Sequence, residues 1–400
     1  MKARTRPPRS TVGAVSTLAL ICALSACSGS GSSSGTAAPS TPAAPTAGSS
    51  PQAAPPALTP ASPSPGQTVS CAAAVTAMNP RARLAQLVVP GVDAGDPRAV
   101  EDLVRTYQVG GIFVGGNKTT LLQNGALNTV QNAAAIPVSV AVDEEGGRVQ
   151  RIDDLDGSIP SARQLASSKS PEEVRALGVQ RGKQLRARGV TVDYAPDADV
   201  SDEPDDAVIG DRSYSSDPEK VRQYAMAFAD GLRAGGVLPV LKHFPGHGHG
   251  SGDSHRGTVV TPPLDQLRQV DLVPYRDIAA YGPVAVMVGH LEVPGLTGDE
   301  PASISPAAYR LLRTDYRFTG PVITDDLGGM KAITDRYQLP DAVLKALQAG
   351  ADQALFSSGH NDVGAVLDRL QAAVGAGELP ADQVKASDER VLAAKGFCTP

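Results

Sequence analysis

The chain has 400 residues and a formal net charge of −6, lacks tryptophan, and is only 4% aromatic. A mildly acidic chain suits nucleic acid poorly, so we expect no nucleic-acid partner. Extended polymer-binding clefts rely on aromatic platforms, so the composition favours a small ligand pocket.

Residues 1–26 have the pattern of a secretory signal. Four basic residues precede an apolar run, Val12 to Ala26, that is too short to span a bilayer comfortably. The segment ends Leu24-Ser25-Ala26-Cys27, which is similar to a bacterial lipobox. We therefore expect Cys27 to be lipidated and to anchor the protein to the outer face of the cytoplasmic membrane. The alternative is an ordinary secreted protein, cut at an Ala-x-Ala-like site.

The segment 27–70 is almost entirely Ser, Pro, Ala, Gly and Thr, and it has no charged residue. It cannot bury enough apolar surface to offset the entropy of ordering, so we predict a disordered linker. The remainder, 71–400, has a normal length for one barrel domain with insertions.

Four cysteines occur in the chain. Cys22 belongs to the signal and Cys27 to the lipidation site, which leaves Cys71 and Cys398 near the two ends of the folded region. Outside the cytoplasm such a pair predicts a disulfide, and two free thiols are the alternative.

Short apolar runs alternate with helical stretches eight times. We expect strands at residues 87–92, 111–114, 138–142, 190–194, 238–242, 284–288, 322–324 and 352–356. We expect helices at residues 97–107, 118–134, 171–188, 217–234, 264–280, 306–316, 340–349, 362–376 and 381–395. This alternation predicts parallel strands with crossover helices, and eight units predict a single α/β domain with a (β/α)8 TIM-type barrel. A doubly wound sheet is the alternative, weakened because no G-x-G-x-x-G follows the first strand.

Polar residues gather after successive strands, at the rim where barrels build their active sites. The clusters are Asp143–Arg148 after the third strand, Asp197 and Asp199 after the fourth, Lys242-His243 ending the fifth, His290 and Glu292 after the sixth, and Asp325-Asp326 ending the seventh. A single cluster fits a solvated loop, but five corresponding clusters predict one shared site.

Two constellations at this rim suggest specific chemistry. A rigid, partly desolvated carboxylate at a strand end suits a nucleophile, so we expect Asp325 to face the pocket and Asp326 to be structural. Asp253 stands two residues before His255 in a loop with four alternating glycines, so it can orient the imidazole as in a dyad. Such a loop can close over a substrate.

The same loop allows other interpretations. His247 and His249 could share zinc with a third ligand, either His243 or Asp253, but the spacing matches no standard zinc pattern. Ser254 suggests a serine hydrolase, but the chain lacks G-x-S-x-G. The glycines suggest a phosphate cradle, but G-x-x-x-x-G-K-[ST] is absent. We therefore expect neither a metal nor a cofactor.

Two further cations lie near this rim. Lys242 needs a polar partner where the barrel core meets the pocket, and a substrate hydroxyl or Asp143 would serve. Arg212 follows the fourth strand, and by itself it is only weak evidence for a site residue, because an exposed arginine is usually a surface charge.

Together these motifs resemble glycoside hydrolase family 3, specifically its bacterial single-domain β-N-acetylglucosaminidase branch. The similarity runs from about Leu84 to about Leu392. The matching runs are Asp143–Arg151, Asp211–Tyr214, Lys242–Gly248, Asp253–His255, Ile323–Leu327 and Ala349–Asp352.

The resemblance implies a retaining enzyme that removes terminal N-acetylglucosamine from cell-wall (peptidoglycan or muropeptide) fragments. It implies Asp325 as nucleophile, His255 as general acid/base and Asp253 as the partner of His255. The residues implied to bind the terminal sugar are Asp143, Arg151, Arg212, Lys242 and His243.

The expected partners are glycans or muropeptides that contain N-acetylglucosamine, with membrane contact only through the lipid anchor, and we expect a monomer. The alternatives are a phosphorylase or β-glucosidase of the same family, a non-catalytic muropeptide-binding lipoprotein, and a metal-dependent hydrolase. Three positions depart from the family pattern: Glu144 replaces glutamine, Tyr214 replaces phenylalanine, and His249 lies in a variable stretch. Glu144 adds a negative charge near the pocket, which leaves the substrate affinity open but not the type of reaction.

Overall fold

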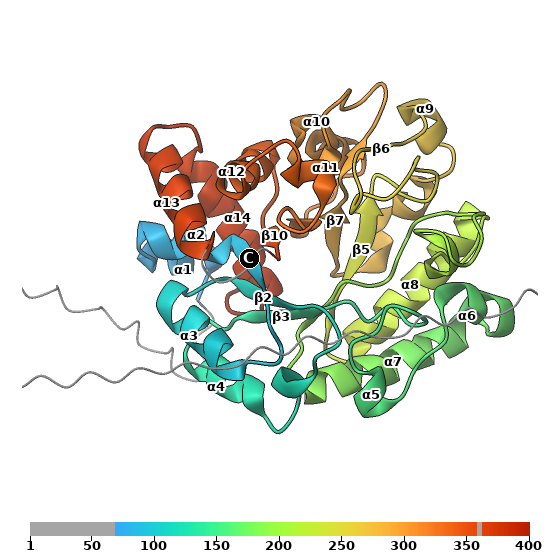
Figure 1. Ribbon diagram of the computed structural model, residues 1–400, viewed down its shortest axis with the longest axis horizontal. Coiled ribbons are helices and arrows are strands. Elements are labelled where there is room, and N and C mark those ends of the chain that lie inside the picture. The colour runs from blue at the N-terminus through green and yellow to red at the C-terminus, as the bar shows by residue number, and fades with distance from the viewer. Residues whose placement is uncertain (1–68, 358–361) are drawn as a thin grey trace, which may run out of the picture. The chain divides into compact units, whose positions relative to one another are not determined.

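The computed structural model describes residues 69–357 and 362–400 (Figure 1). The expected signal at 1–26, the lipidation site Cys27 and all but the last two residues of the 27–70 linker lie outside the described residues. Among the helices described, none has the length and hydropathy needed to cross a membrane.

Eight strands of the described residues form one parallel sheet, in the order β10-β1-β2-β3-β4-β5-β7-β9. They are β1 (Val88–Val92), β2 (Gly111–Val114), β3 (Ser139–Val142), β4 (Val192–Asp193), β5 (Leu238–Phe244), β7 (Ala285–Val288), β9 (Val322–Thr324) and β10 (Ala354–Phe356). A bridge between Ile323 and Gln353 joins β9 to the residue that precedes β10, so the sheet nearly closes. The expected (β/α)8 barrel is confirmed, and the doubly wound sheet is wrong.

Helices surround these strands (Figure 1). Those close to the expected ranges are α3 (Pro97–Tyr107), α7 (Pro171–Ala187), α8 (Pro218–Ala234), α12 (Leu339–Ala349), α13 (Asp362–Gly375) and α14 (Ala381–Ala394). Their starts are well marked, because Asp96, Ser170 and Asp217 each cap a helix whose first turn contains proline. Short helices not expected are α1 (Cys71–Ala77), α2 (Pro80–Gln86), α5 (Asp153–Asp156), α6 (Ala162–Ser168) and α11 (Lys331–Thr334).

Three expected helices are broken. The range 264–280 contains α9 (Leu264–Leu267) and the 3-10 turns η3 (Val273–Tyr275) and η4 (Ile278–Tyr281). Pro274 has no N–H for an α-helical bond, and Asp277 adopts a left-handed conformation with φ 51°.

The other two expected helices that are broken lie at residues 118–134 and 306–316. The range 118–134 splits into η1 (Thr120–Leu122) and α4 (Ala126–Asn132) around Gly125, whose φ is 71°. The range 306–316 splits into α10 (Pro306–Arg310) and the π-helical turn η6 (Leu311–Asp315).

The core has two apolar layers. One lies between the strands and the helices, and the other fills the barrel interior. The interior layer consists of Val89, Ala141, Tyr194, Val240, Ala285, Met287, Ile323 and Leu355. Outside the barrel sheet, β6 (Val259–Val260) pairs with β8 (Leu291–Glu292) and supports the glycine-rich loop that follows β5.

The two ends of the folded region are joined covalently. Cys71 at the start of α1 forms a disulfide with Cys398, which follows α14. The backbone N–H of Cys71 donates to the carbonyl of Thr399 (2.9 Å), which adds a short parallel bridge beside the disulfide. The expected disulfide is confirmed.

Candidate active site

A cavity of about 310 Å³ opens at the C-terminal ends of the barrel strands. Seven of the eight residues expected in the site line it: Asp143, Arg151, Arg212, Lys242, His243, His255 and Asp325. The eighth, Asp253, contacts His255 directly. We call this space the active-site cavity. Parallel strands bring these residues together because all their C-terminal ends meet at one rim.

Lys242, at the end of β5, is paired with two carboxylates. Its Nζ lies 2.7 Å from Asp143 Oδ1 and 2.6 Å from Glu145 Oε1. Burial alone would lower the pKa of Lys242, but the two carboxylates raise it well above its usual range. The expected partner Asp143 is confirmed, and the amine stays charged.

Glu145 is a central residue of the site to which the sequence assigned no role. Arg212 binds it with two hydrogen bonds, Nε to Oε2 and Nη2 to Oε1, both 2.8 Å. Burial opposes ionisation of Glu145, but Arg212 and Lys242 lower its pKa overall. The sequence did place Glu145 in the acidic cluster after β3, which could have marked it as a site residue. The cluster alone does not tell which of its carboxylates pairs with Lys242 or Arg212.

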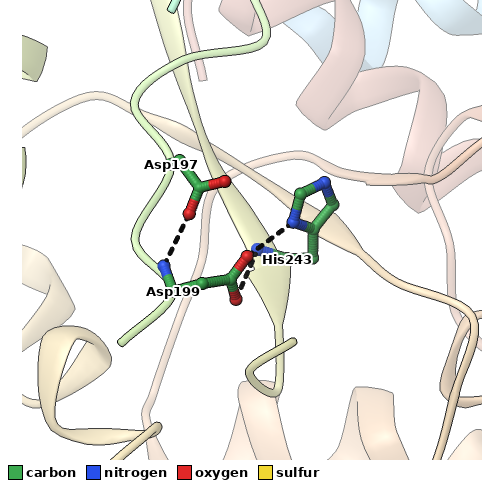
Figure 2. A group of neighbouring side chains, drawn as sticks. All are labelled: Asp197, Asp199 and His243. Carbon is green, nitrogen blue, oxygen red and sulfur yellow. Dashed lines mark hydrogen bonds and ion pairs between the residues drawn. The ribbon is translucent and has the colours of Figure 1, made fainter. Parts of the chain in front are cut away.

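His243 is held in a defined orientation (Figure 2). Its Nδ1 lies 2.7 Å from Asp199 Oδ2, and Asp199 Oδ1 accepts the backbone N–H groups of His243 (3.3 Å) and His247 (2.6 Å). Burial would raise the pKa of Asp199, but His243 and His247 lower it overall. The ionised carboxylate therefore accepts the Nδ1–H of the imidazole and leaves Nε2 available to the cavity.

Within the described residues, one group of side chains has donor atoms close enough to share a metal ion: Asp197, Asp199 and His243. Both oxygens of Asp199 already accept hydrogen bonds, and Arg212 Nη2 lies 3.5 Å from Asp197. These contacts fit a hydrogen-bonded cluster better than a cation site. The expected zinc alternative is not assembled, because His249 Nδ1 instead contacts Asp271 (2.8 Å).

Asp325 and Asp326 have different environments at the end of β9. Both line the cavity, and Asp325 is 7% exposed. Burial would raise its pKa, but His243 and His290 lower it overall, so the carboxylate is ionised. Asp326 Oδ1 accepts N–H groups from Gly328 (2.9 Å), Gly329 (3.0 Å) and Ser357 (2.9 Å). Asp326 therefore fixes the backbone after β9.

The loop after β5 carries the Asp–His pair. His255 Nδ1 lies 2.9 Å from Asp253 Oδ1, and the His255 side chain is 65% exposed. Burial opposes ionisation of Asp253, but its hydrogen bonds with His255 lower its pKa overall. The Ser254 hydroxyl donates to Met330 Sδ (3.3 Å) and not to the imidazole, which does not fit a serine triad. The Ser254 carbonyl accepts the N–H of Ala332, so this loop is anchored beside the cavity.

The effect of Glu144 on substrate affinity, which the sequence left open, can now be related to its position beside the cavity lining. Its side chain is fully buried, and it does not line the active-site cavity. One carboxylate oxygen accepts the backbone N–H groups of Arg151 (2.6 Å) and Ile152 (3.1 Å), and Arg181 Nη1 lies 3.6 Å from the other. These hydrogen bonds hold the loop that carries Arg151. The side chain of Glu144 points into the protein, whereas those of Asp143 and Glu145 face the cavity.

Comparison with known proteins gives a consistent result. A family model described as the glycosyl hydrolase family 3 N terminal domain matches residues 80–394. The chain is 53% identical over 356 residues to β-hexosaminidase LpqI from Mycobacterium tuberculosis, covering 87% of this chain and 91% of that protein. The solved structure of M. tuberculosis LpqI matches with a TM-score of 0.79 at 53% identity, covering 84% of this chain and 98% of that one. A family 3 β-N-acetylglucosaminidase from Paenibacillus sp. str. FPU-7 matches with a TM-score of 0.75 at 30% identity, covering 80% and 62% respectively.

Proposed function

The chain belongs to glycosyl hydrolase family 3, and we propose on that basis that it removes terminal N-acetylglucosamine from cell-wall fragments with retention of configuration. At 53% identity to a β-hexosaminidase over most of both chains, it is a glycosidase of that type. The cell-wall substrate, the retaining mechanism and the residue roles below are the proposal.

The observation that carries the proposal is the position of Asp325. Its carboxylate is buried and ionised, accepts the backbone N–H of Asp326 (2.9 Å), and lines a cavity with charged hydrogen-bonding groups. Attack by Asp325 on the anomeric carbon forms the glycosyl-enzyme bond as the leaving oxygen departs. A molecule that only bound sugars would not need this carboxylate.

The cations and carboxylates of the cavity suit a sugar ring. The fixed pairs Lys242–Asp143 and Arg212–Glu145 present charged donors and acceptors to hydroxyl groups, which gives strong, directional hydrogen bonds. Arg151 also lines the cavity, and its Nη2 lies 3.4 Å from Asp143 Oδ2, so it adds a third cation beside the sugar. His243 contributes Nε2 beside these groups.

His255 is proposed as the acid/base catalyst. Asp253 holds Nδ1, so Nε2 gives a proton to the leaving oxygen in the first step. In the second step the same nitrogen takes a proton from the attacking water. Water then displaces Asp325, and the two displacements retain the anomeric configuration.

The proposed location supports the choice of substrate. A secreted, lipid-anchored bacterial enzyme acts outside the cytoplasm, where peptidoglycan supplies N-acetylglucosamine. A cavity of about 310 Å³ suits one terminal sugar better than a polymer chain.

The test is hydrolysis of p-nitrophenyl N-acetyl-β-glucosaminide and of muropeptides, with the first-formed anomer followed by proton NMR. We expect N-acetylglucosamine in the β configuration from both substrates. The α anomer would refute retention, and activity on the nitrophenyl substrate alone would refute the cell-wall assignment.

Phosphorolysis is a second candidate, favoured by the imidazole at position 255. Unlike a carboxylate acid/base, an imidazole does not repel an incoming phosphate anion. Product analysis in phosphate buffer separates the two reactions, because phosphorolysis gives N-acetylglucosamine 1-phosphate.

A further inference from the structure

A second cavity, also of about 310 Å³, lies at the opposite end of the barrel. Its lining includes the first residues of four strands: Ser139, Val192, Leu238 and Ala285. We call it the lower cavity. Tyr194 lines both cavities and stacks on Phe113 with ring centroids 5.4 Å apart, so this pair separates the two spaces.

The inner wall of the lower cavity is apolar. Ala141, Val240, Ala285 and Ile323 belong to the interior layer of the barrel and line this space. A barrel interior is normally filled by large branched side chains. Two of the six interior-layer residues that line this space, Ala141 and Ala285, are alanine, and the small side chains leave room.

Three basic side chains line the lower cavity. They are Arg186, Arg233 and Lys395, and within the described part of the chain no carboxylate lines it. The active-site cavity differs, because its three lining Lys and Arg side chains face four carboxylates. Arg233 is bonded to Asp230 and to the Tyr281 carbonyl. Arg186 is exposed, and its guanidinium has no hydrogen-bond or ion-pair partner among the described residues.

Lys395 is an unusual cation for this position. Its Nζ donates to the side-chain oxygen of Gln86 (2.7 Å), and no carboxylate of the described residues lies within ion-pair distance. A desolvated ammonium without a counter-ion is costly. Burial accordingly lowers the pKa of Lys395 to about 7, opposed only by the field of Asp388. An anion placed at Nζ would remove this cost.

We propose that the lower cavity binds a small organic anion with an apolar body, of the chemical class of a medium-chain carboxylate. The carboxylate lies at Lys395 and Arg186, and the hydrocarbon chain lies against Ala285 and Ile323. The volume is at the lower end of the range for small-molecule sites, roughly 300–1,000 Å³, which suits a short chain. This site is independent of the sugar-cleaving reaction.

Titration calorimetry with octanoate tests the proposal, with octanol as the neutral ligand of equal length. We expect octanoate to bind one site per chain and octanol to bind at least about tenfold more weakly, because it lacks the charge that Lys395 attracts. Excess N-acetylglucosamine should not displace octanoate. Absence of octanoate binding, equal binding of octanol, or displacement by the sugar would overturn the proposal.

Variants place the ligand. Lys395→Met should weaken octanoate binding at least about tenfold, while Lys385→Met, within α14 and paired with Glu389, should leave it unchanged. Ala285→Leu should block the apolar wall and abolish binding, while hydrolysis of the nitrophenyl substrate continues and reports that the barrel is folded. Unchanged octanoate affinity in Lys395→Met, with native circular dichroism, would refute the site even if Ala285→Leu failed to fold.

Discussion

Asp325 and Asp326 are adjacent in the chain, but their hydrogen bonds assign them different tasks. Asp325→Asn should lower kcat/KM on the nitrophenyl substrate by several orders of magnitude, because an amide cannot form the covalent intermediate. Thermal melts should show an unchanged fold. A fluorinated glycosyl fluoride should label Asp325, as mass spectrometry of peptides would show, and labelling of Asp326 would mean that the wrong carboxylate was chosen.

His255 is exposed and contacts Asp253 among the described side chains, so its proposed role is separable from folding. His255→Ala should impair substrates with poor leaving groups most, because good leaving groups need little protonation. A series of aryl N-acetylglucosaminides with different leaving-group pKa values measures this slope. Asp253→Asn, which keeps the loop but weakens orientation of the ring, should show the same trend to a smaller extent. Equal losses across the series would contradict the acid/base role.

Glu144 provides a test of how the loop that carries Arg151 is held in place. Glu144→Gln should lower the free energy of unfolding by roughly 1–3 kcal/mol, because Arg181 loses its buried counter-charge. KM should change by less than about twofold, since Glu144 does not line the active-site cavity. Chemical denaturation and steady-state kinetics on one preparation measure both effects. A large rise in KM with unchanged stability would mean that Glu144 acts on substrate affinity instead.

At the scale of elements, sequence patterns located the barrel strands better than the irregular segments between them. The residues of β2 and β9 agree with the expected ranges, because a short buried run has a clear start and end. The stretch after β6 shows the limit. Its apolar spacing suits a helix, but Pro274 and the left-handed Asp277 break it into short turns that still bury Tyr275 and Tyr281.

Helix α14 carries a carboxylate that should make stability depend on pH. Asp388 is fully buried, and neither oxygen has a hydrogen-bond partner among the described residues. Burial raises its pKa to about 8, with Arg83 and Lys395 opposing, whereas the unfolded chain has a pKa of about 3.9. Between these values the unfolded state releases a proton that the fold retains, so this group makes stability fall as pH rises from about 4 to about 8.

Asp388→Asn removes that dependence. We expect the variant to melt several degrees higher than the wild type at pH 7.5 and at about the same temperature at pH 4.5. Calorimetric scans at the two pH values measure the difference. Asp382→Asn, an exposed change in the same helix, is the control and should have little effect at either pH. A lower melting temperature of Asp388→Asn at both pH values would contradict the assignment.

At the scale of the whole molecule, the disulfide joins residues 327 positions apart. In the chain-entropy description, closing so long a loop stabilises the fold by roughly 5 kcal/mol. Reduction, or replacement of both Cys71 and Cys398 by serine, should therefore lower the melting temperature by many degrees. Turnover at 25 °C should be unchanged, because the active-site cavity lies at the C-terminal ends of the strands, away from these helices. An unchanged melting temperature under reductant would contradict this role.

The sequence by itself determined the barrel, the rim that holds the polar residues, the cysteine pair and the family. These features depend on local patterns: apolar runs that must be buried, turn residues between them, and short motifs with fixed spacing. The tertiary structure alone decided which side chains face one another. It paired Glu145 with Lys242 and Arg212, and it turned Glu144 away from the cavity.

The tertiary structure also left the lower cavity lined by three cations and, within the described residues, no carboxylate. Its lining includes residues of strands β3, β4, β5 and β7, of helices α7 and α8, and of the end of α14, which are far apart in the chain. The direction of a loop side chain, or the space left between small residues, depends on contacts between such distant segments. No local pattern encodes those contacts. The sequence therefore predicted which residues form the site, and only the fold determined how their side chains are paired.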